Sequence, residues 1–144
     1  PPLVLEQSEI LEKINSKIAK CLCGGIKIKV TGKLRHVINC HCSQCMKSHG
    51  NYAAYTACPE DNIAFINKRT LKWYKSSNIA KRGFCSMCGA SMFYKLTKSR
   101  NISIAAGMFS NPTKLKTYSN IIYFYLNNTV VWLCIFPYLC RGCL

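Results

Sequence analysis

Two different spacings of hydrophobic and polar positions divide the chain. In residues 8–20, Ile10, Leu11, Ile14 and Ile18 recur at intervals of three and four, as on one face of an α-helix. The pattern therefore predicts a short N-terminal helix over residues 8–20. The segment carries no group that suggests chemistry.

From Gly25 onward the period changes to two. The stretch IKIKV at 26–30 alternates apolar and basic residues, which is typical of a half-exposed strand. Turn-forming Gly, Asn, Ser or Pro separates most of the similar short runs that follow. We expect those strands at residues 34–38, 52–57, 63–66, 71–74, 80–84, 91–94 and 102–105. Many short strands without intervening helices predict an all-β fold, either a sandwich or a partly open barrel.

The stretch IIYFYLNNTVVWLCIFPYLC at 121–140 contains no charged residue. Its length would suit a membrane-spanning helix. However, polar residues and Pro137 interrupt it, and Asn127 and Asn128 suit the two-residue turn of a hairpin. We therefore favour two buried strands over a membrane helix, and we expect no membrane partner.

The charge balance is strongly basic. The 144 residues include 20 Lys and Arg against 5 Asp and Glu, a formal net charge of +15. If seven cysteines held two zinc ions as thiolates, about +12 would remain. Such a surface attracts anions, such as nucleic acid, acidic lipid or small carboxylates, and charge alone does not choose among them.

Cysteine is the most informative residue type in the chain. Seven of the 11 cysteines fall in three tight groups, at 21–23, 40–45 and 85–88. A disulfide between such close neighbours is strained and closes almost no loop, whereas metal sites gather their ligands in this way. The spacing favours a reducing compartment, and no basic-then-apolar leader opens the sequence. We therefore expect a cytoplasmic protein.

The two outer groups fit one metal ion. In CLCGG, Cys21 and Cys23 are two apart, so an extended backbone directs both sulfurs to the same side. In FCSMCGA, Cys85 and Cys88 form the knuckle that is common in zinc ribbons. Glycine follows each pair and lets the chain turn. Together they supply the four thiolates of a closed structural zinc site.

The middle group supplies three donors, and the sequence leaves open whether a fourth ligand completes the site. It consists of Cys40, Cys42 and Cys45 in NCHCSQCMKSHG. Cys58, thirteen residues further on, could complete a closed site, and the CRGC motif at 140–143 could compete for a metal. The residues alone leave both a closed and an open three-cysteine site as alternatives.

The order of these motifs resembles that of a known family. CLCGG, NCHCSQCMKSHG, AAYTACP, KRGFCSMCGASMFYK and ISIAAGMF follow one another as in the glutathione-dependent formaldehyde-activating enzymes, which include centromere protein V-like members. The resemblance implies an antiparallel β-tent fold around two zinc sites. It suggests a helical extension at 1–18, a zinc-binding domain at 19–110, and a divergent apolar segment at 111–144 whose strands complete the domain.

The resemblance also assigns roles to the cysteines. It implies a structural zinc on Cys21, Cys23, Cys85 and Cys88, and an open catalytic zinc on Cys40, Cys42 and Cys45. Family members are described as joining glutathione to formaldehyde, and are classed as carbon–sulfur lyases for the reverse reaction. The expected function is thus a zinc-dependent carbon–sulfur lyase or synthase with glutathione, or a similar thiol, as co-substrate and formaldehyde or another small aldehyde as partner.

Other residues near the motifs are candidates for substrate chemistry. His41 and His49 flank the middle group and could move the proton of the adduct. Lys47 and Arg82 stand beside the metal motifs and could pair with the glutathione carboxylates. The sequence departs from the family pattern near its end, where Asn120 occupies the place of an expected histidine.

Two other functions compete with the enzyme. One is a zinc-stabilised binding module for an acidic partner such as nucleic acid, whose affinity would fall steeply with salt. The other is a glutathione carrier without turnover, in which Cys42 forms mixed disulfides. Two metal ions per chain suit the enzyme or the module, and one metal with a reactive thiol suits the carrier.

Overall fold

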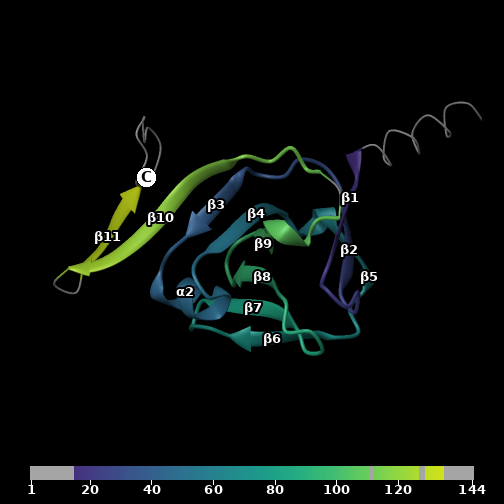
Figure 1. Cartoon of the computed structure of the whole chain (residues 1–144), viewed down its shortest axis with the longest axis horizontal. Coiled ribbons are helices and arrows are strands. Elements are labelled where there is room, and N and C mark those ends of the chain that lie inside the picture. The colour runs from purple at the N-terminus through teal and green to yellow at the C-terminus, as the bar shows by residue number, and fades with distance from the viewer. Residues whose placement is uncertain (1–14, 111, 127–128, 135–144) are drawn as a thin grey trace, which may run out of the picture.

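Short strands make up most of the described chain, as the period of two predicted. The computed structural model describes residues 15–110, 112–126 and 129–134, and it describes only the backbone of residues 122–126 and 129–134. These residues form two β-sheets with short helices between strands (Figure 1). The predicted all-β fold class is confirmed.

The smaller sheet has three antiparallel strands. They are β1 (Lys17–Lys20), β2 (Lys27–Val30) and β5 (Ile63–Asn67), in the order β1-β2-β5. In β2, Ile28 and Val30 are buried while Lys27 and Lys29 are partly exposed. The alternation in IKIKV therefore arises because one face of β2 packs against the core.

Strand β1 corrects the end of the predicted helix. Lys17–Lys20 was expected to close a helix over residues 8–20, but it pairs with β2 in the register Ile18↔Lys29 and Ala19↔Ile28. Ala19 is completely buried by this pairing. Long-range pairing overrides the helical spacing of the isoleucines. The rest of the predicted helix falls on residues 1–14, outside the described residues.

The larger sheet has eight strands in the order β11-β10-β3-β4-β9-β8-β7-β6. The bounds are β3 (Val37–Cys40), β4 (Ala53–Pro59), β6 (Leu71–Lys75), β7 (Ala80–Cys85), β8 (Ser91–Leu96), β9 (Asn101–Ala105), β10 (Thr117–Leu126) and β11 (Thr129–Cys134). Neighbours are antiparallel except for β10 and β3, which run parallel. The predicted strand at 34–38 begins only at Val37.

The C-terminal segment contributes strands to this sheet. β10 and β11 pair antiparallel up to Leu126↔Thr129, as the hairpin prediction requires, although residues 127–128 of the turn lie outside the described residues. Within the described part of the chain, no helix is long and apolar enough to cross a membrane. The structure describes only the backbone of β11, so the prediction that its side chains are buried is not tested.

Three short helices connect strands: α2 (Ser43–His49), η1 (Glu60–Asn62) and η2 (Ala106–Met108). Helix α2 was not predicted, because seven residues inside a cysteine motif are too few to show a helical hydrophobic period. Cys42 caps its N-terminus by accepting a hydrogen bond from the Cys45 N–H at 3.4 Å. Gly50 ends the helix in the left-handed conformation, at φ 84°.

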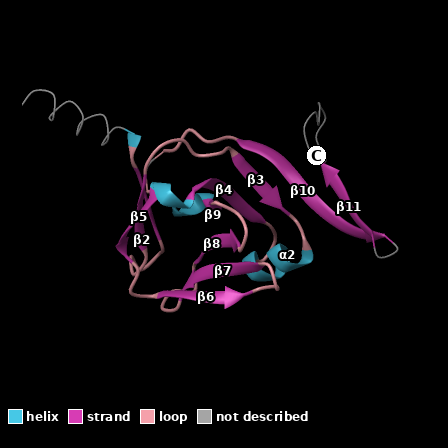
Figure 2. Ribbon diagram, turned by 180° about the vertical axis from the view of Figure 1, so that it is seen from behind, coloured by secondary structure: helices cyan, strands magenta, loops and turns pink. Residues whose placement is uncertain are grey.

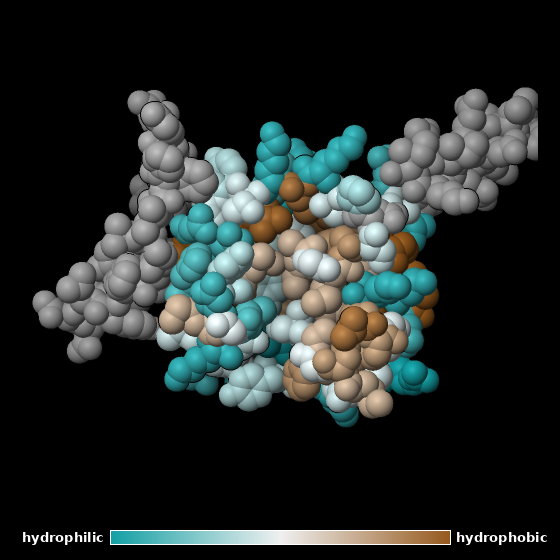
Figure 3. All heavy atoms as spheres, in the orientation of Figure 1, coloured by the Kyte–Doolittle hydropathy of each residue, from teal (hydrophilic) through white to brown (hydrophobic). Residues whose placement is uncertain are grey.

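Two hydrophobic clusters lie under the two cysteine groups. The larger one includes Ile28, Phe93 and Ile104, all fully buried, together with Cys21 and Cys85. The smaller one lies under α2 and contains Cys45, Ala53, Tyr55 and Ala105. Figure 2 shows α2 and the three-stranded sheet at opposite sides of the molecule. Hydrophilic residues cover much of the face in Figure 3, with patches of hydrophobic residues between them.

Candidate metal centres and active site

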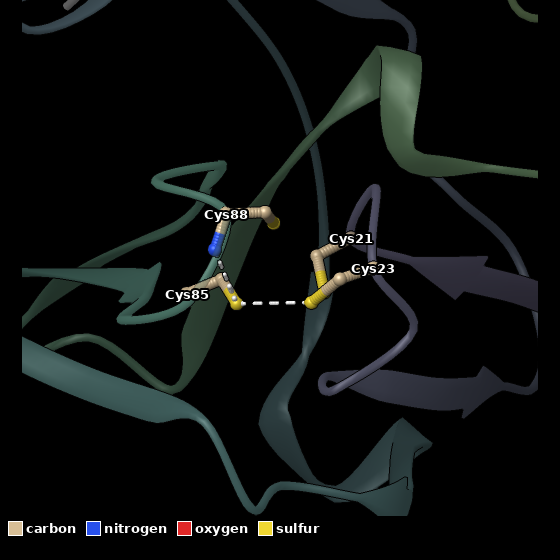
Figure 4. A group of neighbouring side chains, drawn as sticks. All are labelled: Cys21, Cys23, Cys85 and Cys88. Atoms are coloured by element: carbon tan, nitrogen blue, oxygen red, sulfur yellow. Dashed lines mark hydrogen bonds between the residues drawn. The ribbon is translucent and has the colours of Figure 1, made fainter.

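The structure brings together the four cysteines of the outer groups. Cys21 and Cys23 lie just after β1, Cys85 ends β7, and Cys88 lies in the turn before β8, so both sheets contribute (Figure 4). The Cys23 sulfur lies 3.6 Å from the Cys21 sulfur and 3.5 Å from the Cys85 sulfur. All four sulfurs lie within 4.8 Å of one another.

This arrangement fits a tetrahedral zinc ion. Zn–S bonds of about 2.3 Å require sulfurs about 3.8 Å apart, close to the two short distances here. The surroundings favour thiolates as well. Ile26 N–H donates to the Cys21 sulfur at 3.2 Å, and the Thr70 hydroxyl lies 3.0 Å from the Cys85 sulfur. Burial opposes ionisation of Cys85, but the Thr70 contact and the backbone N–H groups of the turn lower its pKa to about 6.

Glycines shape both cysteine turns, as the sequence indicated. Gly24 and Gly89 adopt left-handed conformations, at φ 76° and 71°. Gly25 is constrained differently, because a Cβ atom there would collide with the side chain of Thr70. Thr70 thus lies between the Gly25 backbone and Cys85, and it joins the two halves of the cluster.

The middle group forms a second, separate cluster. Cys40 ends β3, Cys42 caps α2, and Cys45 is buried in the first turn of α2. Their sulfurs lie within 4.8 Å of one another, and no fourth Cys, His, Asp or Glu joins this cluster among the residues that the structure describes. Because the three donors lie within six consecutive residues, the strand-to-helix turn alone brings them together.

Of the possible additional ligands, Cys58 lies away from the three-cysteine cluster. Cys58 belongs to the larger hydrophobic cluster, not to the one under α2, and burial raises its pKa to about 11. That environment suits a buried thiol rather than a metal ligand. Cys140 and Cys143 lie outside the described residues.

Arg82 is the cation closest to the three-cysteine cluster. Its Nη2 atom donates to the Cys45 sulfur at 3.6 Å, and its guanidinium lies 5.1 Å from the centre of the Tyr94 ring. The side chain is only 7% exposed, and Nη1 has no hydrogen-bond partner among the described residues. Hydrogen bonds from Cys40 and Arg82 lower the pKa of Cys45 to about 5 against the effect of burial, while the pKa of Cys40 is raised by its contact with Cys45.

The three-cysteine cluster opens into a pocket of about 530 Å³. Residues from β3, α2, β4, β7, β8, β9 and β10 line it. The lining consists of Arg35, Ile38, Cys40, Cys42, Ser43, Gln44, Cys45, Tyr55, Ser77, Ile79, Arg82, Tyr94, Ser103 and Ile121. Thiols, two arginines, two tyrosine rings and aliphatic side chains therefore face one space, which is what a site for a small polar substrate needs.

The lining of the pocket differs in two residues from the predicted substrate contacts, which stay predictions. Arg82 lines it, but Lys47 is exposed on α2 and does not. Arg35 also lines the pocket, and the sequence had not indicated it as a substrate contact. Its Nη2 atom donates a hydrogen bond to the Tyr55 carbonyl at 3.2 Å. In the predicted strand at 34–38, alternation would direct Arg35 and Ile38 to opposite faces. Arg35 does not lie in a strand, however, and both residues line the pocket.

The two histidines lie beside the cluster and outside the pocket lining. His41 packs against Tyr52 and donates from Nε2 to Asn120 Oδ1 at 3.2 Å. The His49 Nε2 atom lies 3.1 Å from the Tyr55 hydroxyl, and burial lowers the pKa of His49. His49 is thus connected to the pocket through Tyr55, which lines it, whereas the contacts of His41 are with Tyr52 and Asn120. The proton-transfer role of either ring stays a prediction.

Asn120 occupies a structural position next to the active-site turn. Its Oδ1 atom accepts hydrogen bonds from Asn39 Nδ2 at 3.1 Å and from His41. The parallel pairing of β10 with β3 places Asn120 opposite Asn39 and Ile121 opposite Cys40. The residue that replaces the expected histidine thus joins the two strands that carry Cys40 and Ile121.

The comparisons with known proteins agree with this site. Residues 16–125 match the family described as glutathione-dependent formaldehyde-activating enzyme, and the chain belongs to this family. An uncharacterized lyase of Schizosaccharomyces pombe is 28% identical over 81 residues, which cover 56% of this chain and 58% of the relative. The chain therefore aligns with less than two thirds of that curated relative.

A solved structure supports the fold independently. A crystal structure of a Rhodobacter sphaeroides protein is similar to this chain with a TM-score of 0.55 and 22% sequence identity. The similarity covers 67% of this chain and 93% of that protein. At this identity the likeness describes the fold alone.

Proposed function

We propose that this protein is a zinc-dependent carbon–sulfur lyase or synthase that joins a small aldehyde such as formaldehyde to glutathione or a similar thiol, and catalyses the reverse reaction. One observation carries the proposal. Three cysteines without a fourth protein ligand among the described residues open into a pocket that also holds a buried arginine. A closed structural site would need neither the pocket nor the cation.

In this proposal the two clusters hold zinc for different purposes. Cys21, Cys23, Cys85 and Cys88 hold a structural ion, and Cys40, Cys42 and Cys45 hold the catalytic one. Zinc held by three cysteines supplies a free ligand position and lowers the pKa of a bound thiol. The two cysteine clusters support metal binding, and family membership and the lyase relative support the lyase reaction.

The chain's own residues prepare the pocket for a thiol substrate. Arg82 stabilises the Cys45 sulfur as a thiolate through its 3.6 Å hydrogen bond. Tyr94, Ile38 and Ile121 contribute apolar surface to the lining of the pocket. Arg35 lies on the exposed side of the pocket, where it can pair with a carboxylate of a peptide thiol such as glutathione.

The test combines turnover with metal content. Purified protein should accelerate formation of S-(hydroxymethyl)glutathione from glutathione and formaldehyde, measured by exchange NMR, and should contain two zinc ions per chain. Cys42→Ser should abolish the acceleration and lose one zinc ion while the protein remains folded. Cys58→Ala is the matched control, since Cys58 lies in neither cluster, and it should retain both activity and metal.

The same assay distinguishes the carrier and the binding module. A carrier would bind glutathione without accelerating the reaction, and a nucleic-acid module would bind DNA or RNA with an affinity that falls steeply as salt rises. Full turnover in Cys42→Ser, with one zinc ion lost, would contradict the proposed role of the three-cysteine cluster.

A further inference from the structure

The Arg82 guanidinium is a buried cation with unused hydrogen-bonding capacity. The side chain is 7% exposed, and Nη1 is buried without a partner in the described part of the chain. A buried N–H group without a partner destabilises the folded state, and more so on a charged group, so native proteins rarely keep one without a use. The pocket is where this atom can find an acceptor, because Arg82 lines it.

The guanidinium is fixed in place rather than free to search for a partner. Arg82 lies in β7 opposite Tyr94 of β8, and its guanidinium lies 5.1 Å from the Tyr94 ring. Its Nη2 atom is held on the Cys45 sulfur. With one nitrogen and the plane of the group fixed, the direction of Nη1 is set before substrate arrives, which is the condition for electrostatic preorganisation.

Carboxylates do not neutralise this cation. The acidic residues in the described part of the chain are Glu60 and Asp61, and neither lines the pocket. Glu60 instead pairs with Lys95 at 2.6 Å. Among the described residues, the Cys45 sulfur accepts a hydrogen bond from Nη2, and Cys42 and Tyr55 also lie close enough to interact with the charge of Arg82. Nη1 is left without an acceptor and can donate to an additional negative charge.

The reaction creates a negative charge on the aldehyde oxygen, which is bonded to the carbon that the substrate sulfur attacks. When the thiolate of the substrate attacks the aldehyde carbon, a C–S bond forms and the π bond of the carbonyl breaks. The electron pair moves to oxygen, and this alkoxide then takes a proton from water at the pocket mouth, while the thiol proton has left to solvent on binding. The addition balances without an oxidant or reductant.

We propose that Arg82 is a catalytic residue, donating a hydrogen bond from Nη1 to the aldehyde oxygen as that oxygen becomes an alkoxide. The inference rests on the proposed function and deepens it. Nη1 and Nη2 share one carbon, so an acceptor of Nη1 lies near the Cys45 sulfur and the three-cysteine cluster, where the proposed function places the substrate thiol. This assignment replaces the earlier expectation that Arg82 binds a glutathione carboxylate, a role that the more exposed Arg35 suits better.

The first experiment separates rate from binding. Arg82→Gln and Arg82→Lys are compared with wild type and with Lys47→Gln, an exposed control that does not line the pocket. Loss of one preorganised donor lowers kcat by about 100-fold or more. We expect that loss in Arg82→Gln and a partial loss in Arg82→Lys. Calorimetry should show the dissociation constant for glutathione changed by less than threefold, with metal content and circular dichroism unchanged.

The second experiment needs no turnover. S-(Carboxymethyl)glutathione carries negatively charged oxygens near the sulfur, and S-propylglutathione is a neutral analogue of similar size. Substitution of Arg82 by Gln should weaken binding of the first at least tenfold and leave binding of the second unchanged. Equal weakening of both, or of neither, would overturn the inference.

The outcomes distinguish this inference from the proposed function. An active wild type whose Arg82→Gln variant keeps its kcat refutes the role of Arg82 and leaves the function intact. A tenfold rise in the glutathione dissociation constant with unchanged kcat would assign Arg82 to carboxylate binding, and loss of zinc would assign it to cluster stability. Absence of turnover in the wild type refutes both proposals.

Discussion

The two cysteine clusters place the same type of side chain in different surroundings. The four-cysteine cluster joins segments 62 residues apart, and backbone N–H groups and a threonine hydroxyl surround its sulfurs. The three-cysteine cluster comes from six consecutive residues, and a buried arginine and a pocket adjoin it. Ligand number, partner type and open space, rather than the thiols themselves, therefore separate the proposed structural centre from the proposed reactive one.

The clusters also differ in what they hold together. A metal ion on Cys23 and Cys85 would connect the end of the three-stranded sheet to the eight-stranded sheet, and closing so long a loop stabilises the folded state strongly. A metal ion on Cys40 and Cys45 closes almost no loop. Loss of the first ion should therefore affect folding, and loss of the second should affect chemistry.

The largest expected effect comes from breaking the structural cluster. Cys85→Ser should lose at least one zinc ion and a large part of the free energy of unfolding, which for a domain of this size is about 5–15 kcal/mol. We expect an insoluble protein, or one without a cooperative thermal transition in circular dichroism. Cys42→Ser is the matched comparison and should keep that transition. Equal thermal transitions in both variants would contradict the division of roles.

A subtler change tests the hydroxyl that supports Cys85. Thr70→Val keeps the side-chain shape but removes the group 3.0 Å from the Cys85 sulfur. Outer partners of metal ligands typically contribute 10–100-fold in metal affinity, so we expect a loss of that order at one of two zinc sites, measured by competition with a chelator. Thr56→Val, at a buried threonine outside the cluster, controls for loss of a buried hydroxyl. If both variants keep wild-type affinity, Thr70 has no role in holding the metal.

Arg35 tests the open side of the reactive cluster. Arg35→Gln should raise the dissociation constant for glutathione about tenfold, or about 1.4 kcal/mol, because a cation at the pocket is lost. The variant should keep its kcat and its affinity for a neutral thiol such as 2-mercaptoethanol. Lys47→Gln, exposed and away from the pocket lining, should behave as wild type in calorimetry. A larger effect in Lys47→Gln would restore the original expectation for that residue.

The smallest expected effect concerns the strand beside the reactive turn. Asn120→Leu removes two hydrogen bonds, to Asn39 and His41, and should lower the free energy of unfolding by about 1–2 kcal/mol in urea titrations. Turnover should fall only slightly, since Asn120 does not line the pocket. Tyr118→Leu, at an exposed position of the same strand, provides the comparison. A complete loss of activity in Asn120→Leu alone would instead indicate a direct part in the chemistry.

Local patterns predicted a large part of this molecule. The short apolar runs at residues 63–66 and 91–94 predicted β5 and β8, and the C-x-C and C-x-x-C spacings placed seven sulfurs in two groups. These features depend on neighbours in sequence, where strand alternation and turn geometry act directly. The same reasoning predicted the strands of the C-terminal hairpin from the asparagine pair.

The remaining features depend on partners that are distant in sequence. Ala19 lies in a strand because Ile28 pairs with it, which the helical spacing around it could not reveal. Arg35 reaches the pocket because the chain there leaves the sheet. Nothing in the sequence near Arg82 shows that Nη1 is buried without a partner, because that property results from the packing of β7 against β8 and α2.

The parallel pairing of β10 with β3 has a consequence for biosynthesis. His41 N–H donates to the Ile121 carbonyl at 2.8 Å, so β3 is secured by a strand that is translated later. During synthesis the cysteines at 21–23 and 85–88 leave the ribosome before residue 117, while one edge of β3 still has no neighbour. An open strand edge promotes association between chains. Chains that terminate between residues 96 and 116 would therefore carry a complete structural cluster and an uncovered edge, and should aggregate rather than remain as inactive monomers.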